Sequence, residues 1–126
     1  MEGVNLENYK NALRVLDEAM LKPPANPLER DGLIKRFDYC FEISWKSADK
    51  VLQFHGLKAD TPRNIFRELA RIGWINNPEQ WIEFLEARNK TSHLYHEKLA
   101  EELFQIIPIF LEATHKLLVG LEEKLK

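Results

Sequence analysis

One short segment of this chain gathers side chains that suit phosphate chemistry. It runs from Arg88 to Tyr95 and reads Arg-Asn-Lys-Thr-Ser-His-Leu-Tyr. Arg88 carries a permanent positive charge on a rigid fork of donors that matches phosphate oxygens. Histidine titrates near neutral pH, so His93 is a natural general base or general acid. The two side chains together predict a site that handles a phosphate ester.

These two groups suit the cleavage of RNA. His93 would help to remove the proton from a ribose 2′-hydroxyl, and Arg88 would stabilise the charge that develops on the phosphate. Neither role needs a metal ion. Arg88 and His93 are therefore candidate catalytic residues that could cleave RNA without a metal ion.

Helix geometry limits how the two residues can meet. On an uninterrupted helix, residues five apart lie about 140° apart around the axis, so Arg88 and His93 would diverge while Arg88 and Tyr95 would share a face. Convergence requires a break in the helix or a second copy of the chain. The four polar residues 89–92 favour a break, because their side chains compete for the hydrogen bonds of a helix.

An ordinary structural role for this segment stays open. Arg88 would then pair with Glu86 or Glu101, and Ser92 would cap the last helix. The histidine and the tyrosine would be residues at the boundary of a helix. Residue chemistry alone does not decide between this alternative and a phosphate site.

A metal site is a further alternative. His93, His96 and Glu97 lie at helix spacings that can bind a metal ion. No third histidine or cysteine is near in sequence, since His55 and His115 look like a helix-end residue and a surface residue. The sequence therefore predicts neither a metal nor another cofactor.

Two other groups of residues have simpler interpretations. Cys40 lies in an aromatic helix stripe, which predicts a core residue rather than a nucleophile. Six basic residues lie between positions 46 and 71, and Arg63, Arg67 and Arg71 share one helix face. They form either a basic strip for RNA or a solvated face.

Composition indicates a cytoplasmic protein. The chain has 126 residues, 44% hydrophobic and 30% charged, which predicts one domain over 1–126. A net charge of −2 gives no overall electrostatic case for nucleic-acid binding. A single cysteine excludes an internal disulfide and fits a reducing compartment. The N-terminus has no apolar signal region, and no run approaches the roughly 18 apolar residues of a membrane span, so we expect no membrane contact.

The periodicity of apolar residues is helical nearly throughout the chain. Helix starts are indicated at Asn26-Pro27, Thr61-Pro62 and Asn77-Pro78, where a capping residue precedes a proline. Gly56 and Gly73 are placed to end two of the helices. No alternating strand pattern extends beyond a few residues. The predicted fold is an all-α, up-and-down bundle of four or five helices.

The last predicted helix runs from about Glu97 to the C-terminus. Residues 106–111, Ile-Ile-Pro-Ile-Phe-Leu, are apolar on all sides, a pattern typical of a helix buried all round, and Pro108 should kink it. A bundle of this size cannot easily hide every apolar side chain of this helix. We therefore expect a homodimer formed through helices.

Three ordered blocks of the chain match the pattern of one protein family. Residues 88–95 fit the signature R-x(4)-H-x-Y. Residues 36–46, RFDYCFEISWK, look like the second-helix pattern R-F-E-(F/Y)-x-F-E-x-x-W-K. Residues 61–75 resemble an S-P-R … G-x-I element. With these blocks the chain resembles, over roughly residues 5–120, HEPN-domain proteins encoded beside a minimal nucleotidyltransferase, which are often labelled nucleotidyltransferase substrate-binding proteins.

The resemblance implies a helical bundle that dimerises so that both motifs line one cleft. Family members of this kind are toxins of toxin–antitoxin pairs and act as metal-independent endoribonucleases. The catalytic arginine and histidine correspond to Arg88 and His93, and the polar supporting residue corresponds to Asn89. Tyr95 corresponds to the tyrosine that the antitoxin, the partner nucleotidyltransferase, adenylylates to silence the toxin. An added nucleotide would place charge and bulk beside Arg88 and oppose the approach of an RNA phosphate.

The sequence departs from the family pattern in small ways. His96 stands where the family more often has Asp or Asn, which adds a second titrating group near His93. Cys40 replaces a commoner Thr or Ala. The acidic overall charge keeps a second hypothesis open, a non-catalytic substrate-binding subunit of a two-component nucleotidyltransferase. A third is a purely structural dimerisation module, so enzymatic activity stays undecided by the sequence.

Overall fold

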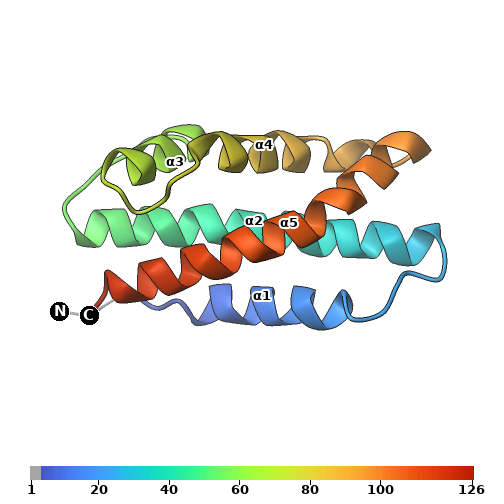
Figure 1. Cartoon of the computed structure of the whole chain (residues 1–126), viewed down its shortest axis with the longest axis horizontal. Helices are drawn as coiled ribbons and strands as arrows, with labels where there is room; N and C mark the ends of the chain where they lie inside the picture. The colour runs from blue at the N-terminus through green and yellow to red at the C-terminus, as the bar shows by residue number, and fades with distance from the viewer. Residues whose placement is uncertain (1–3) are drawn as a thin grey trace.

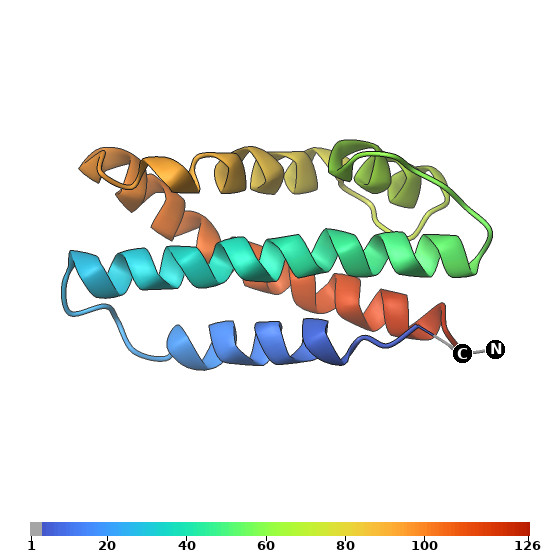
Figure 2. The same ribbon diagram turned by 180° about the vertical axis from the view of Figure 1, so that it is seen from behind.

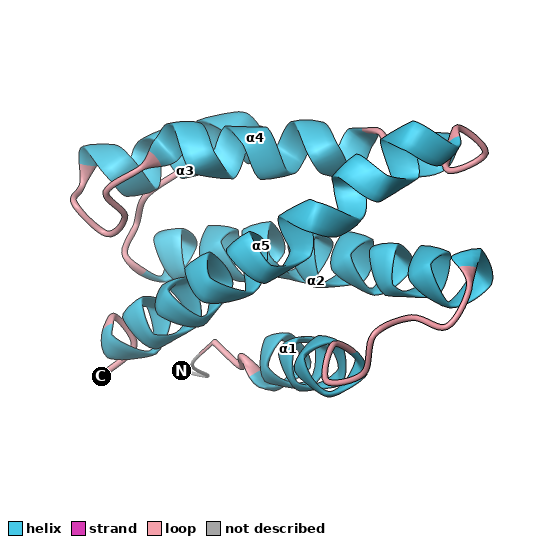
Figure 3. Ribbon diagram, turned by 45° about the vertical axis from the view of Figure 1, so that its right-hand side comes forward, coloured by secondary structure: helices cyan, strands magenta, loops and turns pink. Residues whose placement is uncertain are grey.

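The computed structural model describes residues 4–126, and every regular element in that range is helical. Figure 3 shows helices and loops only in the described part of the chain. The all-α prediction is therefore confirmed, while residues 1–3 of the predicted domain lie outside the described residues. The elements are α1 (Glu7–Ala19), α2 (Pro27–Phe54), α3 (Pro62–Arg71), α4 (Pro78–Asn89), the short 3-10 helix η1 (Thr91–His93) and α5 (Glu97–Glu123).

The helices are arranged around α2. Figure 1 shows α1 running antiparallel along one side of α2, and α3 and α4 following one another along the other side. From the end of α4, α5 crosses the bundle diagonally back toward α1. The view from behind shows α2 spanning the length of the molecule (Figure 2), and α2 contacts all four of the other α-helices. The pair α3–α4 thus acts as one leg of an up-and-down bundle.

Local sequence signals set the helix boundaries. The side chains of Asn26, Thr61 and Asn77 each accept a hydrogen bond from the backbone N–H three residues later, at 2.9, 3.1 and 3.2 Å, and a proline follows each cap. Gly56 and Gly73 follow the ends of α2 and α3 with φ of 74° and 83°, a conformation that glycine adopts without strain. These predicted starts and stops are confirmed.

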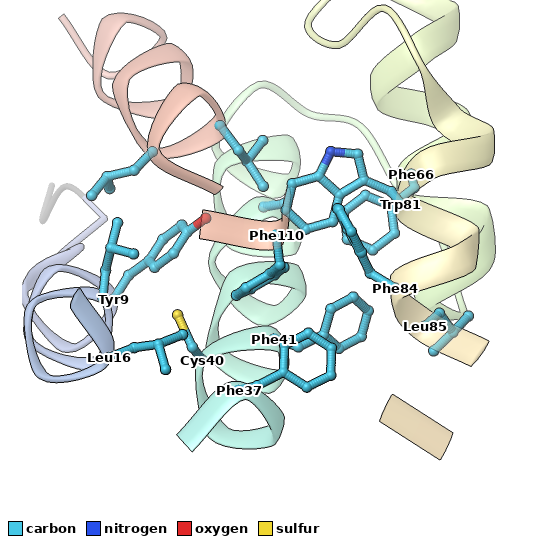
Figure 4. Close-up of a cluster of buried hydrophobic side chains, with 14 of the residues drawn as sticks. Tyr9, Leu16, Phe37, Cys40, Phe41, Phe66, Trp81, Phe84, Leu85 and Phe110 are labelled. Carbon is cyan, nitrogen blue, oxygen red and sulfur yellow. The ribbon is translucent and has the colours of Figure 1, made fainter. Parts of the chain in front are cut away.

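Aromatic rings from four helices fill the centre of the bundle (Figure 4). The ring of Phe110 meets that of Phe37 edge-on, with centroids 4.9 Å apart. Phe66 stacks on Trp81 at 4.7 Å and an interplanar angle of 12°. The geometry is that of favourable aromatic pairs. The cluster consists of Phe37 and Phe41 on α2, Phe66 on α3, Trp81 and Phe84 on α4, and Phe110 on α5.

Two buried titratable side chains lie where α1, α2 and α5 meet. Cys40 has no solvent exposure, and burial raises the pKa of its thiol to about 12. The thiolate that a nucleophile requires is therefore not formed at neutral pH, and the prediction of a core cysteine is confirmed. Burial also raises the pKa of Tyr9, whose hydroxyl donates to the carbonyl oxygen of Thr114 at 3.2 Å and joins α1 to α5.

The single chain buries residues 106–111 only in part, as expected for a bundle too small to hide every apolar side chain of this helix. Ile107 and Phe110 are buried, but Pro108 is exposed and Ile109 keeps 53% of its surface in solvent. The reason is that α5 lies across the face of the bundle, so only its inner side is covered. The helix continues through Pro108, and its path in Figure 1 bends between the first turns (orange) and the C-terminal part (red). A homodimer that covers the outer side stays a prediction.

By length and composition alone, α5 also meets the criteria for a membrane-crossing helix, the one such helix within residues 4–126. Its best 18-residue window has a mean hydropathy of 1.3, and 33% of that window is buried. A core helix of a soluble protein passes the same test. Ile107 and Phe110 pack inside the bundle, so α5 has the contacts of a core helix, and the expected absence of membrane contact stays a prediction.

Replacing Phe110 should test the core directly. We expect Phe110→Ala to lower the free energy of unfolding by about 3–5 kcal/mol, because it removes a fully buried ring and leaves a cavity. Leu28→Ala is the control, since Leu28 is 81% exposed, and it should change stability by less than about 0.5 kcal/mol. Chemical denaturation measures both, and equal losses would contradict this description of the core.

Candidate functional site

The helical path breaks at the segment 88–95. The helix α4 ends at Asn89, and α5 begins only at Glu97. The side chain of Thr91 donates to the carbonyl oxygen of Arg88 at 2.8 Å, which replaces the backbone hydrogen bond that would continue the helix. The predicted break is confirmed, and its cause is the predicted competition from a polar side chain.

Short turns then carry the chain from η1 to α5. The N–H of His93 donates to the carbonyl of Lys90 at 3.0 Å, and the N–H of His96 donates to that of His93 at 3.1 Å. Between them, Leu94 is partly buried against the core and anchors the loop. The N-cap of α5 is His96, without a side-chain capping bond. The alternative in which Ser92 caps the last helix is therefore wrong, because Ser92 lies four residues too early, inside η1.

Carboxylates of α2 hold the guanidinium of Arg88. Its Nε lies 3.3 Å from a carboxylate oxygen of Asp38, and its Nη2 donates to Glu42. On the other edge, Nη1 lies 3.4 Å from the side-chain oxygen of Asn89. The guanidinium carbon is 5.7 Å from the ring centroid of Phe41, a cation–π distance. One edge of Arg88 is thus fixed to α2.

The structural alternative predicted that Arg88 pairs with Glu86 or Glu101, and this prediction is wrong. Glu86 points toward α3, where Arg63 lies 3.9 Å away, and Glu101 accepts from Arg30 at 2.8 Å. Residues two apart on a helix lie on nearly opposite sides, so Glu86 cannot reach Arg88. Arg88 instead pairs with Asp38 and Glu42 on α2.

Glu42 connects several groups around the arginine. Its Oε1 also accepts a hydrogen bond from Trp45 Nε1 at 2.8 Å, and its Oε2 lies 3.2 Å from Lys46 Nζ. Asp38 in turn pairs with Lys35 at 3.1 Å. Three cations and two carboxylates give a formal sum of +1 for this cluster. The two carboxylates orient the arginine and at the same time offset its charge.

A shallow pocket opens beside this cluster. Asp38, Arg88, Asn89, Thr91 and Ser92 line it. The structure therefore brings together Arg88 and Asn89, the two polar candidates at the end of α4. The Nη1 of Arg88 donates to the side-chain oxygen of Asn89. The candidate histidine is not among the residues that line this pocket.

His93 has a different neighbour, the predicted modification residue. Its Nδ1 lies 3.2 Å from the hydroxyl oxygen of Tyr95, with the rings 5.8 Å apart and nearly perpendicular. The ring of His96 also contacts that of Tyr95, at 4.4 Å between ring centroids. Tyr95 is 75% exposed. Within one chain, the segment therefore forms two groups, Arg88 with Asn89, and His93 with Tyr95.

Glu97, the third ligand in the metal-site alternative, is bound by Arg30. The nearly buried guanidinium of Arg30 donates to Glu97, Asp31 and Glu101, and it holds the pKa of Glu97 below its usual range. Across residues 4–126, no group of three or more His, Cys, Asp or Glu side chains is placed to hold a metal ion.

The remaining candidates have ordinary surroundings. His55 is the C-cap of α2 and His115 is an exposed partner of Asp17, which confirms their helix-end and surface roles. In the basic group, Arg63 and Arg71 form ion pairs with Glu86 and Glu68. These pairs favour the solvated-face interpretation.

The sequence interpretation missed Asp38 and Glu42 as partners of Arg88. Both lie in the 36–46 block that resembles the family pattern, four residues apart and therefore on one helix face. That spacing is a signal that was available. Their partner, however, is 46 residues from Glu42, and only the packing of α4 on α2 brings it near.

Comparison with known proteins identifies the family. The family described as "Nucleotidyltransferase substrate binding protein like" matches residues 4–123. The chain belongs to this family. The resemblance seen in the three sequence blocks is therefore confirmed.

Three relatives support the assignment. The probable ribonuclease HepT of Haemophilus influenzae is 30% identical over 98 residues, which cover 74% of this chain and 67% of that protein. A crystal structure from Thermus thermophilus has a TM-score of 0.84 and 31% identity, covering 90% of this chain and 98% of its own. HI0074 of Haemophilus influenzae has a TM-score of 0.82 and 25% identity, with coverages of 94% and 99%. HI0074 is described as having the fold of a substrate binding domain of a nucleotidyltransferase.

A double-mutant cycle should measure the link between α4 and α2. We expect Arg88→Ala and Glu42→Ala to show a coupling energy of about 1–2 kcal/mol, because the pair is partly buried and hydrogen-bonded. The matched control is Arg14 with Glu18, an exposed pair at i, i+4, for which we expect less than about 0.5 kcal/mol. Denaturation curves of the four variants in each cycle provide the values, and a coupling near zero for Arg88 would contradict the clamp.

Lowering the pH should remove the contribution of Glu97 to the free energy of unfolding. Because Arg30 lowers its folded-state pKa, Glu97 adds stability above the pKa of an unfolded glutamate, and this is lost as pH falls through the folded-state value. Glu97→Gln should therefore be less stable than the wild type at neutral pH. The difference should shrink as pH falls below the ordinary pKa of a glutamate, and vanish once pH is below the lowered folded-state pKa. Glu102→Gln, an exposed change on the same helix, is the matched control for the loss of one carboxylate. A Glu97→Gln difference that persists unchanged in acid would contradict the pairing.

Proposed function

We propose that this chain is a HEPN-type toxin of a toxin–antitoxin pair and acts as a metal-independent endoribonuclease. A partner minimal nucleotidyltransferase, the antitoxin, silences it by adenylylating Tyr95. The observation that carries the proposal is the helix break, which leaves an oriented Arg88 and an exposed His93 on one short segment. Family membership and the probable ribonuclease relative support it.

Arg88 acts as the phosphate clamp. Its Nε and Nη2 are held by Asp38 and Glu42, and Arg88 and Asn89 both line the pocket. In this proposal the phosphate binds to Nη1, which has a second N–H besides the one directed at Asn89. A phosphate oxygen bound there receives a charge-assisted hydrogen bond from a side chain that is already oriented. Asn89 supports the same phosphate by hydrogen bonding.

His93 acts as the general base or acid. It removes the proton from a ribose 2′-hydroxyl, and the resulting oxygen attacks the adjacent phosphorus and displaces the 5′-oxygen of the next nucleotide. With Nδ1 directed at Tyr95, Nε2 is the nitrogen available to the RNA.

A homodimer completes the site. Because His93 lies outside the pocket of Arg88, a second copy of the chain supplies the missing group across the cleft. The exposed apolar residues Ile109 and Val119 of α5 are the surface that such a dimer covers.

Adenylylation of Tyr95 blocks this arrangement. The tyrosine hydroxyl lies at His93, so the attached nucleotide places a phosphodiester charge and a bulky base beside the catalytic group. An RNA phosphate is then repelled and excluded from the site.

Cleavage assays test the proposed activity. We expect the purified wild type to cleave RNA in the presence of EDTA, and expression without the partner to arrest growth. Arg88→Ala and His93→Ala should each lower the cleavage rate at least about 100-fold. Arg67→Ala, an exposed basic change on α3, is the control and should stay within a few-fold. Harmless expression of a folded wild type that leaves RNA intact would overturn the proposal.

The second candidate is a non-catalytic substrate-binding subunit of a two-component nucleotidyltransferase. The observation that favours it is that two carboxylates already offset the charge of Arg88. The description of HI0074 as a substrate binding domain is consistent with it. This candidate predicts tight co-purification with the partner and no cleavage by the isolated protein.

A further inference from the structure

We propose that His93 is also the general base for the adenylylation of Tyr95 in the same chain. The inference rests on the proposed function, since it concerns the step by which the partner silences the toxin. The hydrogen bond of 3.2 Å between His93 Nδ1 and the Tyr95 hydroxyl carries it.

A tyrosine hydroxyl needs help to become a nucleophile. It ordinarily keeps its proton at neutral pH, so a base within hydrogen-bond distance is required to activate it. The distance of 3.2 Å from His93 Nδ1 is within that reach. Local structure supports the contact, because the turn from His93 to His96 and the partly buried Leu94 fix the backbone on both sides of the pair.

The other groups near Tyr95 are not placed for this role. The ring of His96 lies against the tyrosine ring, with centroids 4.4 Å apart, and the hydrogen bond of the hydroxyl goes to His93. Glu97 is bound to Arg30. Tyr95 is nevertheless 75% exposed, so a nucleoside triphosphate held by the partner can reach its oxygen.

The adenylylation step consumes a nucleoside triphosphate, which the partner supplies. The hydroxyl proton of Tyr95 passes to His93 Nδ1, and the oxygen forms a bond with the α-phosphorus of the nucleoside triphosphate. The bond from that phosphorus to the oxygen bridging to the β-phosphate breaks, and pyrophosphate leaves with the electron pair. The products are a tyrosyl nucleotide phosphodiester, pyrophosphate and a protonated histidine that returns its proton to water.

The two tautomers of neutral His93 suit the two reactions. When Nε2 carries the proton, Nδ1 accepts from Tyr95 and can activate it. When Nδ1 carries the proton, it donates to the tyrosine oxygen, and Nε2 is free to act as the base on RNA. One residue therefore serves both cleavage and its silencing. Once modified, the tyrosine oxygen has no proton left to give to Nδ1.

Label transfer from ATP labelled at the α-phosphate, catalysed by the purified partner nucleotidyltransferase, tests the proposal on the full chain. His93→Asn is the decisive variant, because its side-chain oxygen accepts a hydrogen bond near the Nδ1 position but cannot take a proton. We expect its rate of adenylylation to fall at least about 100-fold. The matched control His96→Ala, which loses ring contact with Tyr95 but not its hydrogen bond, should stay within about three-fold. Circular dichroism and co-purification with the partner check that each variant folds and binds.

The outcomes separate this inference from the proposed function. If the wild type is labelled and His93→Asn is labelled at the same rate, His93 is not the base, while the proposed function stands. If Tyr95→Phe still accepts the label, or if the wild type accepts none, modification of Tyr95 itself is refuted and the base role with it. Loss of labelling in His93→Asn together with full labelling of His96→Ala supports the proposal.

Discussion

The position of Phe41 on α2 links the core of the bundle to the candidate site. Its ring lies 6.3 Å from the rings of Phe110 and Trp81 and 5.9 Å from that of Phe66, so it packs against three other helices, α3, α4 and α5. The same ring lies 5.7 Å from the guanidinium carbon of Arg88, and the carboxylates that bind this arginine flank Phe41 on the same helix, at Asp38 and Glu42. Packing of the aromatic core therefore positions the C-terminal end of α4, and with it Arg88, against α2. A change in the core would move the arginine together with the helix.

The sequence predicted those features that depend on neighbouring residues. A capping side chain and a proline mark the start of α2 at Asn26, and Gly56 ends it, because both signals act within one helical turn. The break after Arg88 was predictable for the same reason, since the competing side chain of Thr91 is three residues away. The partners of Arg88 were not predictable, because they are about 50 residues distant and are brought near only by packing. The exposure of Ile109 also depends on where α5 lies across the bundle, which periodicity does not specify.

The proposed function rests on the two separate groups of side chains within the segment 88–95. Arg88 and Asn89 line one pocket, while His93 and Tyr95 form a separate pair. In our proposal a single chain is thus an incomplete nuclease, and a second chain completes it. In the same proposal, the residue that is adenylylated, Tyr95, lies at the catalytic base, His93. Modification then does not need a conformational change, because the added nucleotide lies where the reaction would occur.

The chemistry of the cleaved ends tests the central claim most directly. Attack by a ribose 2′-hydroxyl, assisted by His93 and Arg88 without a metal ion, leaves a 2′,3′-cyclic phosphate on one fragment and a 5′-hydroxyl on the other. Mass spectrometry of a defined RNA oligonucleotide, incubated with the purified protein in EDTA, identifies both ends. Our account predicts these two ends. Fragments that carry a 3′-hydroxyl and a 5′-phosphate, or cleavage that occurs only when a divalent cation is added, would contradict it.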